Sequence, residues 1–295
     1  MICMNESKLP VSVVISTYKT REVTLKALAA LFATAPLPAQ VILIDNCSND
    51  GSVEVYKQAY PQVEYVVNEK DLGFAGSNNR AIRDFTTQPY IWLLNSDTET
   101  GQHSLEQLYQ YMEVHPNVGA VGPQLIYPNG TLQSTGGYFP SPLNVFLYLF
   151  PISKFLPKSV KKKIKQIALF PQPIPEEGLE LDYVTAAAVL LRKKALDEAG
   201  LLAEDFYMYF EETDLCLRLK KRGWKRTVIS TEPVMHIYGG SFKTQFDKRR
   251  LKLTLQSLVL FIKKNYIGWR RYVMLFEIFL LGDFSLLVKR LKNFI

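Results

Sequence analysis

Two adjacent acids, Glu211 and Glu212, occupy the position in this sequence that best suits acid–base chemistry. They follow an aromatic run at 206–210 and precede a helical pattern in which Asp214 and Arg218 lie four residues apart. Apolar surroundings raise the pKa of a carboxyl group, whereas a helix N-terminus lowers it. A carboxylate in such a place can act as a general base. Taken alone, the two acids fit a solvated first helical turn better, so the rest of the chain has to decide.

The elements that would position these acids alternate between apolar strands and helical patterns. This alternation predicts an α/β fold with a mainly parallel central sheet flanked by helices. Short apolar runs that end in polar or glycine-rich turns mark the strands. The predicted strands are 11–18, 40–45, 63–68, 90–97, 119–127, 182–192 and 226–231, and the segment 234–241 is predicted as a loop.

Polar side chains stand where the first four predicted strands end: Thr17 and Tyr18, Asp45, Asn68 and Asp97. In parallel sheets, ligands bind beyond the carboxyl ends of the strands. This coincidence therefore predicts a ligand site at that edge. Asp97 at a strand end also suits a divalent metal, because hard cations prefer carboxylate oxygens.

Missing motifs argue against several classes of protein. The 295-residue chain has no G-x-x-x-x-G-K-[ST] run and no G-x-G-x-x-G after its first strand, which disfavours a P-loop NTPase or a Rossmann dehydrogenase. Its three cysteines lack metal-type spacing, which indicates a reducing cytoplasm. No signal-peptide pattern opens the chain, and no apolar stretch reaches the length of a spanning helix.

Charge patterning points to the C-terminal part of the chain. A net charge of +7 permits nucleic acid, anionic lipid or phosphate-bearing partners. The basic residues cluster beside apolar runs, chiefly in 251–295, as at a membrane edge, so nucleic-acid binding is not expected. Glu277 and Asp283 interrupt the best apolar window there and argue against spanning. Two interpretations stay open: membrane-interface contact, or packing on the catalytic domain or another subunit.

In their order and spacing, the motifs resemble those of inverting family 2 glycosyltransferases with the GT-A fold, in the rhamnosyltransferase-like branch. The resemblance covers about residues 10–245 and implies a GT-A catalytic domain at 1–245, followed by a C-terminal helical segment at 246–295. The matching pieces are 13–18, 45–52, Asn68, 73–79, 93–97, 182–185, 206–218 and His236 with 239–241.

The resemblance also implies roles for individual residues. Glu212 would be the general base, with Glu211 as its partner in the catalytic acid pair. Asp97 and His236 would bind Mn²⁺ or Mg²⁺ on the donor diphosphate. Ala186 and Arg80 replace glycines common in the family, which leaves the choice of sugar open. The residues expected to bind the nucleotide-sugar are Thr17, Tyr18, Arg21, Asp45, Asn68, Asn79, Asn95, Ser96 and Asp97.

The implied activity is transfer of a sugar, with inversion, to a saccharide or lipid-linked saccharide of a bacterial surface polysaccharide. The resemblance favours dTDP-L-rhamnose as donor, with a UDP-sugar as the alternative. It places the enzyme in the cytoplasm, peripherally on the inner face of the membrane, and allows a homodimer. Two other classes stay open: a non-catalytic sugar-nucleotide or glycan-binding subunit, and a nucleotidyltransferase, which would need a more basic loop after the first strand.

Overall fold

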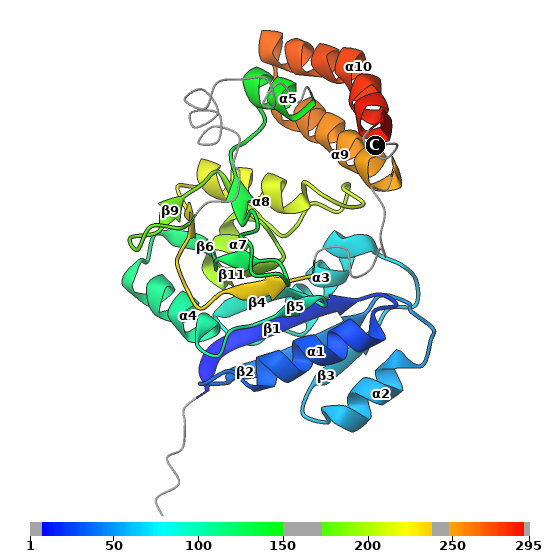
Figure 1. Ribbon diagram of the computed structural model, residues 1–295. Coiled ribbons are helices and arrows are strands. Elements are labelled where there is room, and N and C mark those ends of the chain that lie inside the picture. Colours follow the sequence, from blue (N-terminus) through cyan, green and yellow to red (C-terminus); the bar gives the residue numbers. More distant parts are fainter. Residues whose placement is uncertain (1–7, 150–172, 238–247, 292–295) are drawn as a thin grey trace, which may run out of the picture.

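An eight-stranded sheet forms the centre of the fold (Figure 1). The computed structural model describes residues 8–149, 173–237 and 248–291, so the motif residues 239–241 lie outside it. The strand order is β3-β2-β1-β4-β11-β6-β12-β9, and only β9 and β11 run against the others. The predicted α/β fold with a mainly parallel sheet is therefore confirmed. The strands are β1 Leu9–Thr17, β2 Pro38–Asp45, β3 Glu64–Val67, β4 Tyr90–Asn95, β6 Val118–Gly122, β9 Leu179–Glu180, β11 Ala188–Arg192 and β12 Lys225–Val228.

Helices cover both faces of this sheet because its central strands are apolar on both sides. In β1, Val13 and Ile15 belong to one core and Val14 to the other, and all three are fully buried. Helices α1, α2 and α4 contribute to the first core, and α3, α7 and α8 to the second. The helices are α1 Arg21–Phe32, α2 Ser52–Ala59, α3 Gly73–Asp84, α4 Ser104–Val114, α7 Lys193–Ala199 and α8 Glu211–Lys221.

Two small sheets correct three sequence predictions. The single strand predicted at 119–127 is two strands, β6 in the central sheet and β7 in a small sheet, because β7 pairs with β13. The segment 234–241 begins as a strand, β13, because its backbone pairs with β5 and β7. The single strand predicted at 182–192 is two strands, because the Thr185 N–H donates to Thr135 O while Ala187 O accepts from the Asn95 N–H. The small-sheet strands are β5 Thr98–Glu99, β7 Leu125–Ile126, β8 Gly136–Gly137, β10 Tyr183–Val184 and β13 Val234–His236.

A third apolar cluster lies beyond the sheet layers, where α5 (Pro142–Leu149) meets α9 (Lys248–Asn265) and α10 (Gly268–Leu291). In Figure 1, α10 lies farthest from the sheet. The predicted C-terminal helical extension is therefore present, and it packs with a helix from the middle of the chain. Among the described residues, no helix is both long enough and apolar enough to cross a bilayer.

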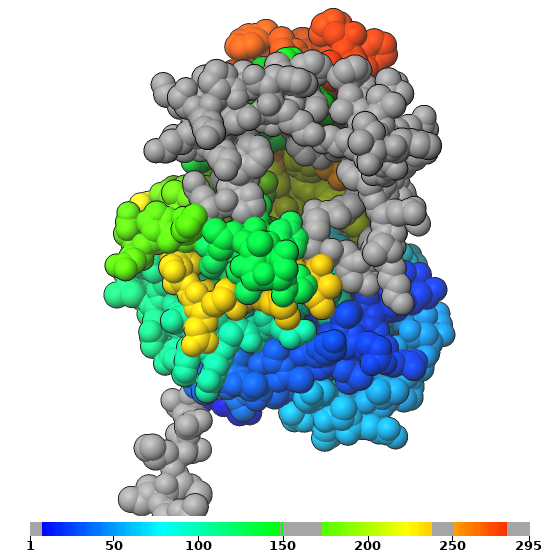
Figure 2. Space-filling view, viewed as in Figure 1, coloured from blue at the N-terminus to red at the C-terminus, as the bar shows by residue number. Residues whose placement is uncertain are grey.

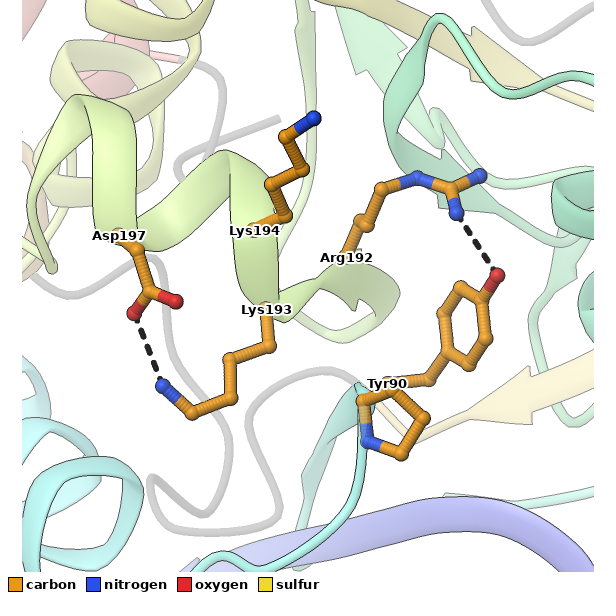
Figure 3. A pocket seen from close by; sticks show the side chains of 6 residues that line it. Tyr90, Arg192, Lys193, Lys194 and Asp197 are labelled. Atoms are coloured by element: carbon orange, nitrogen blue, oxygen red, sulfur yellow. Dashed lines mark hydrogen bonds and ion pairs between the residues drawn. The ribbon is translucent and has the colours of Figure 1, made fainter.

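Arg192 fastens the sheet to α4 at the amino end of β4 (Figure 3). Its guanidinium donates to the carbonyls of Val118 and Met112 at 3.1 and 2.7 Å, and to the Tyr90 hydroxyl at 2.8 Å. Burial raises the pKa of Tyr90 to about 12, so the hydroxyl stays protonated. The shallow hollow beside this contact therefore belongs to a structural clamp. It is lined by Pro89, Tyr90, Arg192, Lys193, Lys194 and Asp197.

Arg192→Met should lower the free energy of unfolding by about 2–4 kcal/mol, because it removes charge-assisted hydrogen bonds and leaves carbonyl acceptors without a donor. Urea unfolding followed by fluorescence measures the loss. Arg83→Met is the matched control: that side chain is 60% exposed beside Asp84, so less than about 0.5 kcal/mol should be lost. Equal effects of the two substitutions would contradict the clamp.

Candidate active site

The carboxyl ends of β3, β2, β1 and β4 lie side by side and carry the predicted polar residues. Thr17 and Asp45 are direct partners in the β1–β2 register. The Asn68 N–H donates to Asp45 O at 2.8 Å, which holds the end of β3 level with β2. Asp97 follows β4, the neighbour of β1 on its other side. The structure therefore brings these four residues to one edge of the sheet.

Asp45 presents one unused acceptor at this edge. Its Oδ2 accepts from the Ser48 N–H at 2.8 Å, whereas its Oδ1 is buried and has no hydrogen-bond partner. Cys47 and Asn49 hold the turn in a left-handed conformation, with φ of 67° and 50°. Because an unpaired buried carboxylate oxygen is costly, the Oδ1 atom marks a place where a ligand donor could bind.

Asn68 is already fully engaged by the protein. Its amide donates to Asn46 Oδ1 at 3.0 Å and to Ser77 Oγ at 3.3 Å, and its Oδ1 accepts from Arg80. Asn46 in turn donates to Asp71 at 2.6 Å. Arg80 therefore helps to hold the loops after β2 and β3.

Asn79 is not brought to this cluster. Its amide donates to Leu202 O at 2.8 Å and to Glu204 Oε1 at 2.9 Å, and its Oδ1 accepts from the Leu202 N–H. Arg21 likewise contacts the protein, donating to Ser52 Oγ and Asp50 O. Tyr18, by contrast, is 44% exposed at the strand edge.

His236 lies against Asp97, with its Nε2 3.3 Å from Asp97 Oδ1. Strand β13 places it there by pairing with β5, with His236 opposite Thr98. Asn95 also approaches the Nε2 atom, at 3.4 Å. Both His236 and Asp97 are buried, although far apart in sequence. Ser96, between Asn95 and Asp97, lies 3.2 Å from the Thr20 hydroxyl, which ties this turn to α1.

Gln133 fixes the tautomer of His236. Its Oε1 lies 2.6 Å from His236 Nδ1, and its Nε2 donates to the backbone carbonyl of His236. Because Oε1 can only accept, Nδ1 carries a hydrogen, which leaves Nε2 as the ring nitrogen that faces Asp97 and could bind a metal. A carboxylate and an oriented imidazole nitrogen are a donor set that fits Mn²⁺ or Mg²⁺. The described residues hold no cluster of three or more His, Cys, Asp or Glu with metal-binding geometry.

The acid pair forms the first two residues of α8, directly after a strained turn in the chain. Tyr209 and Phe210 both have left-handed backbones, with φ of 69° and 71°, a conformation rare for bulky residues. Glu211 is buried and its Oε2 has no hydrogen-bond partner, whereas Glu212 is half-buried. Burial, reinforced by the charge of Glu212, raises the pKa of Glu211 well above its usual value, and burial also raises the pKa of Glu212.

The chain just before this turn touches the sheet edge. The Tyr207 hydroxyl donates to Asp71 Oδ2 at 3.5 Å, and Asp71 binds Asn46, the neighbour of Asp45. A methyl group on Gly73 would come within 3.2 Å of Tyr207 O, which shows how closely the two loops pack. The loop that leads into the acid pair therefore packs against the strand-end site.

Helix α9 supports the strained turn from the other side. Ser257 Oγ donates to Met208 O at 2.7 Å, and Phe261 packs on Phe210 with ring centroids 5.5 Å apart. Asn265 donates to the buried Asp214 at 3.2 Å. No motif singles out Ser257, Asn265 or Gln133, because each acts through a contact distant in sequence; nothing short of the fold identifies them.

Solved structures with similar folds are glycosyltransferases. GalNAc-T7 with UDP, GalNAc and Mn²⁺ has a TM-score of 0.59 at 15% identity, over 77% of this chain and 43% of its own. Mannosyltransferase PcManGT from Pyrobaculum calidifontis, with GDP-Man and Mn²⁺, has a TM-score of 0.56 at 15% identity, over 88% of this chain and 64% of its own. The protein therefore has the GT-A fold.

Sequence relatives define the family. Residues 12–198 match glycosyl transferase family 2, and the chain belongs to that family of glycosyltransferases. It is 26% identical over 270 residues to the N-acetylglucosaminyl-diphospho-decaprenol L-rhamnosyltransferase of Mycobacterium tuberculosis, covering 88% of this chain and 86% of the relative. It is 22% identical to the low-salt glycan biosynthesis hexosyltransferase Agl10 of Haloferax volcanii, over 71% of this chain and 61% of the relative.

Glu211→Gln should make stability less dependent on pH. Because folding raises the pKa of Glu211, its stabilising contribution is complete below its ordinary pKa of 4.5 and is lost as the pH rises through the raised value. Glutamine mimics the protonated form, so the variant should gain stability over wild type at about pH 8 and lose this advantage towards about pH 4. Urea unfolding across this range tests it.

Glu54→Gln, at an exposed position on α2, is the control and should follow the wild-type pH dependence. A Glu211→Gln variant with the same pH dependence as wild type would show that the carboxyl group is not held in its protonated form by the fold.

Proposed function

We propose that this glycosyltransferase moves L-rhamnose, with inversion, from dTDP-L-rhamnose to a lipid-linked saccharide in the synthesis of a bacterial surface polysaccharide. The observation that carries the proposal is the acid pair that opens α8 beside the strand-end site, with Glu211 buried, Glu212 half-buried and the pKa of both raised. The name of the mycobacterial relative, which covers most of both chains, supports the sugar and the type of acceptor. The runner-up donor is a UDP-sugar.

In this proposal, the strand ends bind the donor nucleotide. The unpaired Oδ1 of Asp45 would accept the imide N–H of the base, and the exposed ring of Tyr18 would lie against the nucleotide. Thr17 and Arg21 would shape that part of the site. The existing hydrogen bonds of Asn68 and Asn79 favour a supporting role over the direct contact that their motifs predicted.

Asp97 and His236 would hold a divalent cation beside Asn95 and Ser96. When bound, such a cation stabilises the negative charge of the departing diphosphate. Gln133 would keep His236 in the tautomer that can bind it. The Mn²⁺ in the two structural neighbours belongs to those proteins, and it supports the same use here.

Glu212 would act as the general base, because it is the more exposed member of the pair and a raised pKa makes its carboxylate a stronger base. Its carboxylate would accept the proton of an acceptor hydroxyl. The hydroxyl oxygen would then bond to the anomeric carbon as the bond to the diphosphate breaks, which inverts the configuration. Glu211 is too buried to meet the acceptor and would position its neighbour.

Glu212→Gln should lower the transfer rate by about 10²–10⁴-fold while nucleotide binding survives, because only the proton acceptor is lost. Transfer is measured with dTDP-L-rhamnose and an acceptor, and binding by calorimetry. Glu177→Gln, at an exposed position, should change neither. Full activity in Glu212→Gln would show that another group is the base.

The wild-type rate should fall with decreasing pH at values above 4.5, the ordinary pKa of glutamate, because the base works only when ionised and its pKa is raised. A pH profile of kcat measures this. A rate that stays constant down to pH 4.5 would contradict the assignment.

Calorimetric titration of dTDP, UDP and GDP, with Mn²⁺ and then with EDTA, tests the donor and the metal. We expect dTDP to bind in the presence of Mn²⁺. The Gln133→Leu substitution should lower the affinity for Mn²⁺ by about 10–100-fold, because the His236 ring is no longer held in place. A preference for UDP would move the donor to a UDP-sugar. Binding without transfer would favour a non-catalytic sugar-nucleotide or glycan-binding subunit.

A lipid-linked acceptor would place the enzyme on the cytoplasmic face of a membrane. We therefore propose that the C-terminal helices attach the enzyme peripherally to that membrane. We prefer this role for the helices to the alternative, in which they form a homodimer interface. The division into a catalytic part at 1–245 and a helical segment at 246–295 follows the motifs, although α9 also supports the acid-pair turn.

A further inference from the structure

One side of α10 exposes a row of aromatic rings. Trp269, Tyr272, Phe276 and Phe279 are 66%, 71%, 60% and 79% exposed. They are spaced three, four and three residues apart, so they lie along one side of the helix. Leu280, at 53% exposure, extends the row. We call these five residues the aromatic face of α10.

The opposite side of α10 already meets the needs of folding. Met274 is fully buried, and Leu275, Ile278 and Leu281 pack with it in the cluster formed with α5 and α9. A surface helix normally needs one apolar stripe, directed at the core. The aromatic face is a second stripe that the fold does not use, and a contiguous exposed apolar patch of this kind marks an interaction surface.

The charges around the aromatic face identify the kind of surface it would meet. Residues 248–281 contain eight Lys or Arg and a single acid, Glu277, and one of these cations, Lys264, pairs with Asp205 and not with a partner outside the fold. Arg270 is exposed with its guanidinium 5.7 Å from the centre of the Trp269 ring, and Lys263 is exposed at the end of α9. Trp and Tyr with flanking cations are typical of segments that lie in the headgroup region of a bilayer with anionic lipids.

A second copy of the chain is a poorer occupant. Two aromatic faces brought together around a twofold axis would also bring together two sets of basic residues, with Glu277 as the single acid in residues 248–281 of each copy. An anionic bilayer instead offers opposite charge to Arg270 and Lys263 and an apolar layer to the rings. The charge balance therefore favours lipid over self-association.

We infer that the aromatic face of α10 docks on an anionic membrane surface, with its rings at the boundary between headgroups and acyl chains. This inference deepens the proposed function, on which it rests for the lipid-linked acceptor. Figures 1 and 2 show α10 at an outer end of the molecule. Because α9 contacts both α10 and the acid-pair turn, docking would hold the turn close to the lipid surface.

Flotation with vesicles tests the inference on the full chain. Wild type should bind phosphatidylcholine vesicles containing phosphatidylglycerol and bind pure phosphatidylcholine vesicles more weakly. Phe276→Ser with Phe279→Ser should weaken binding to the mixed vesicles at least about 10-fold, because two apolar rings no longer leave water. Val114→Ser with Val67→Ser removes exposed apolar side chains elsewhere and should bind as wild type.

A charge variant provides an independent arm. Arg270→Gln with Lys263→Gln should lower binding to the mixed vesicles by about 10-fold and reduce its sensitivity to salt. Binding to pure phosphatidylcholine should not change. All the changed side chains are exposed, so each variant should fold as wild type does. Circular dichroism checks this.

Three results would overturn the inference: no binding of wild type to the mixed vesicles, equal binding by the phenylalanine variant, or a wild-type dimer that the phenylalanine substitutions convert to monomer. The vesicles contain neither donor nor acceptor, so the outcome does not depend on the proposed transfer reaction. Transfer to a water-soluble acceptor analogue should be unchanged in the phenylalanine variant. Loss of transfer with intact vesicle binding would count against the proposed function alone.

Discussion

The level ends of four parallel strands are the constraint on which the site depends. Hydrogen bonding between neighbouring strands fixes Thr17 beside Asp45, and the end of β3 beside Asp45 on the other side. Loops that leave such an edge start from fixed points, so polar residues distant in sequence face one region of space. The short β5–β13 pairing extends the same logic to His236, which the chain brings back beside Asp97.

Two acids of the candidate site are incompletely satisfied by the protein. Asp45 and Glu211 each keep a buried oxygen without a partner, and Tyr209 and Phe210 hold left-handed backbones. Each feature costs stability, since buried polar groups are normally hydrogen-bonded and bulky residues avoid positive φ. The well-filled cores on both faces of the sheet and the Arg192 clamp offset these costs away from the site. The residues that stabilise the fold are therefore different from the residues whose polar atoms stay available for a ligand.

The sequence was enough to predict the order of strands and helices and the edge at which polar residues gather. The spacing of apolar residues and the residue types of turns carry this information, and both depend on residues that are close together in the chain. The approach of His236 to Asp97 was anticipated only through the family resemblance, since β13 forms by pairing with distant strands. Asn79 looked like a ligand contact, yet its amide faces Leu202 and Glu204. Gln133 and Ser257 could not be found, because a lone Gln or Ser carries no pattern until the fold supplies its partner.

The contacts of α9 have a consequence for how the chain can be divided. A shortened protein that ends before α9 would keep the central sheet and all the motif residues named above, which end at 241. It would lose Ser257, Phe261 and Asn265, the residues that hold the turn and first helical residues around the acid pair. The contacts that hold the acid pair therefore extend well beyond residues 12–198, the part of the chain that matches the family. Comparison of relatives by their motifs alone would overlook a helix on which the geometry of the acids rests.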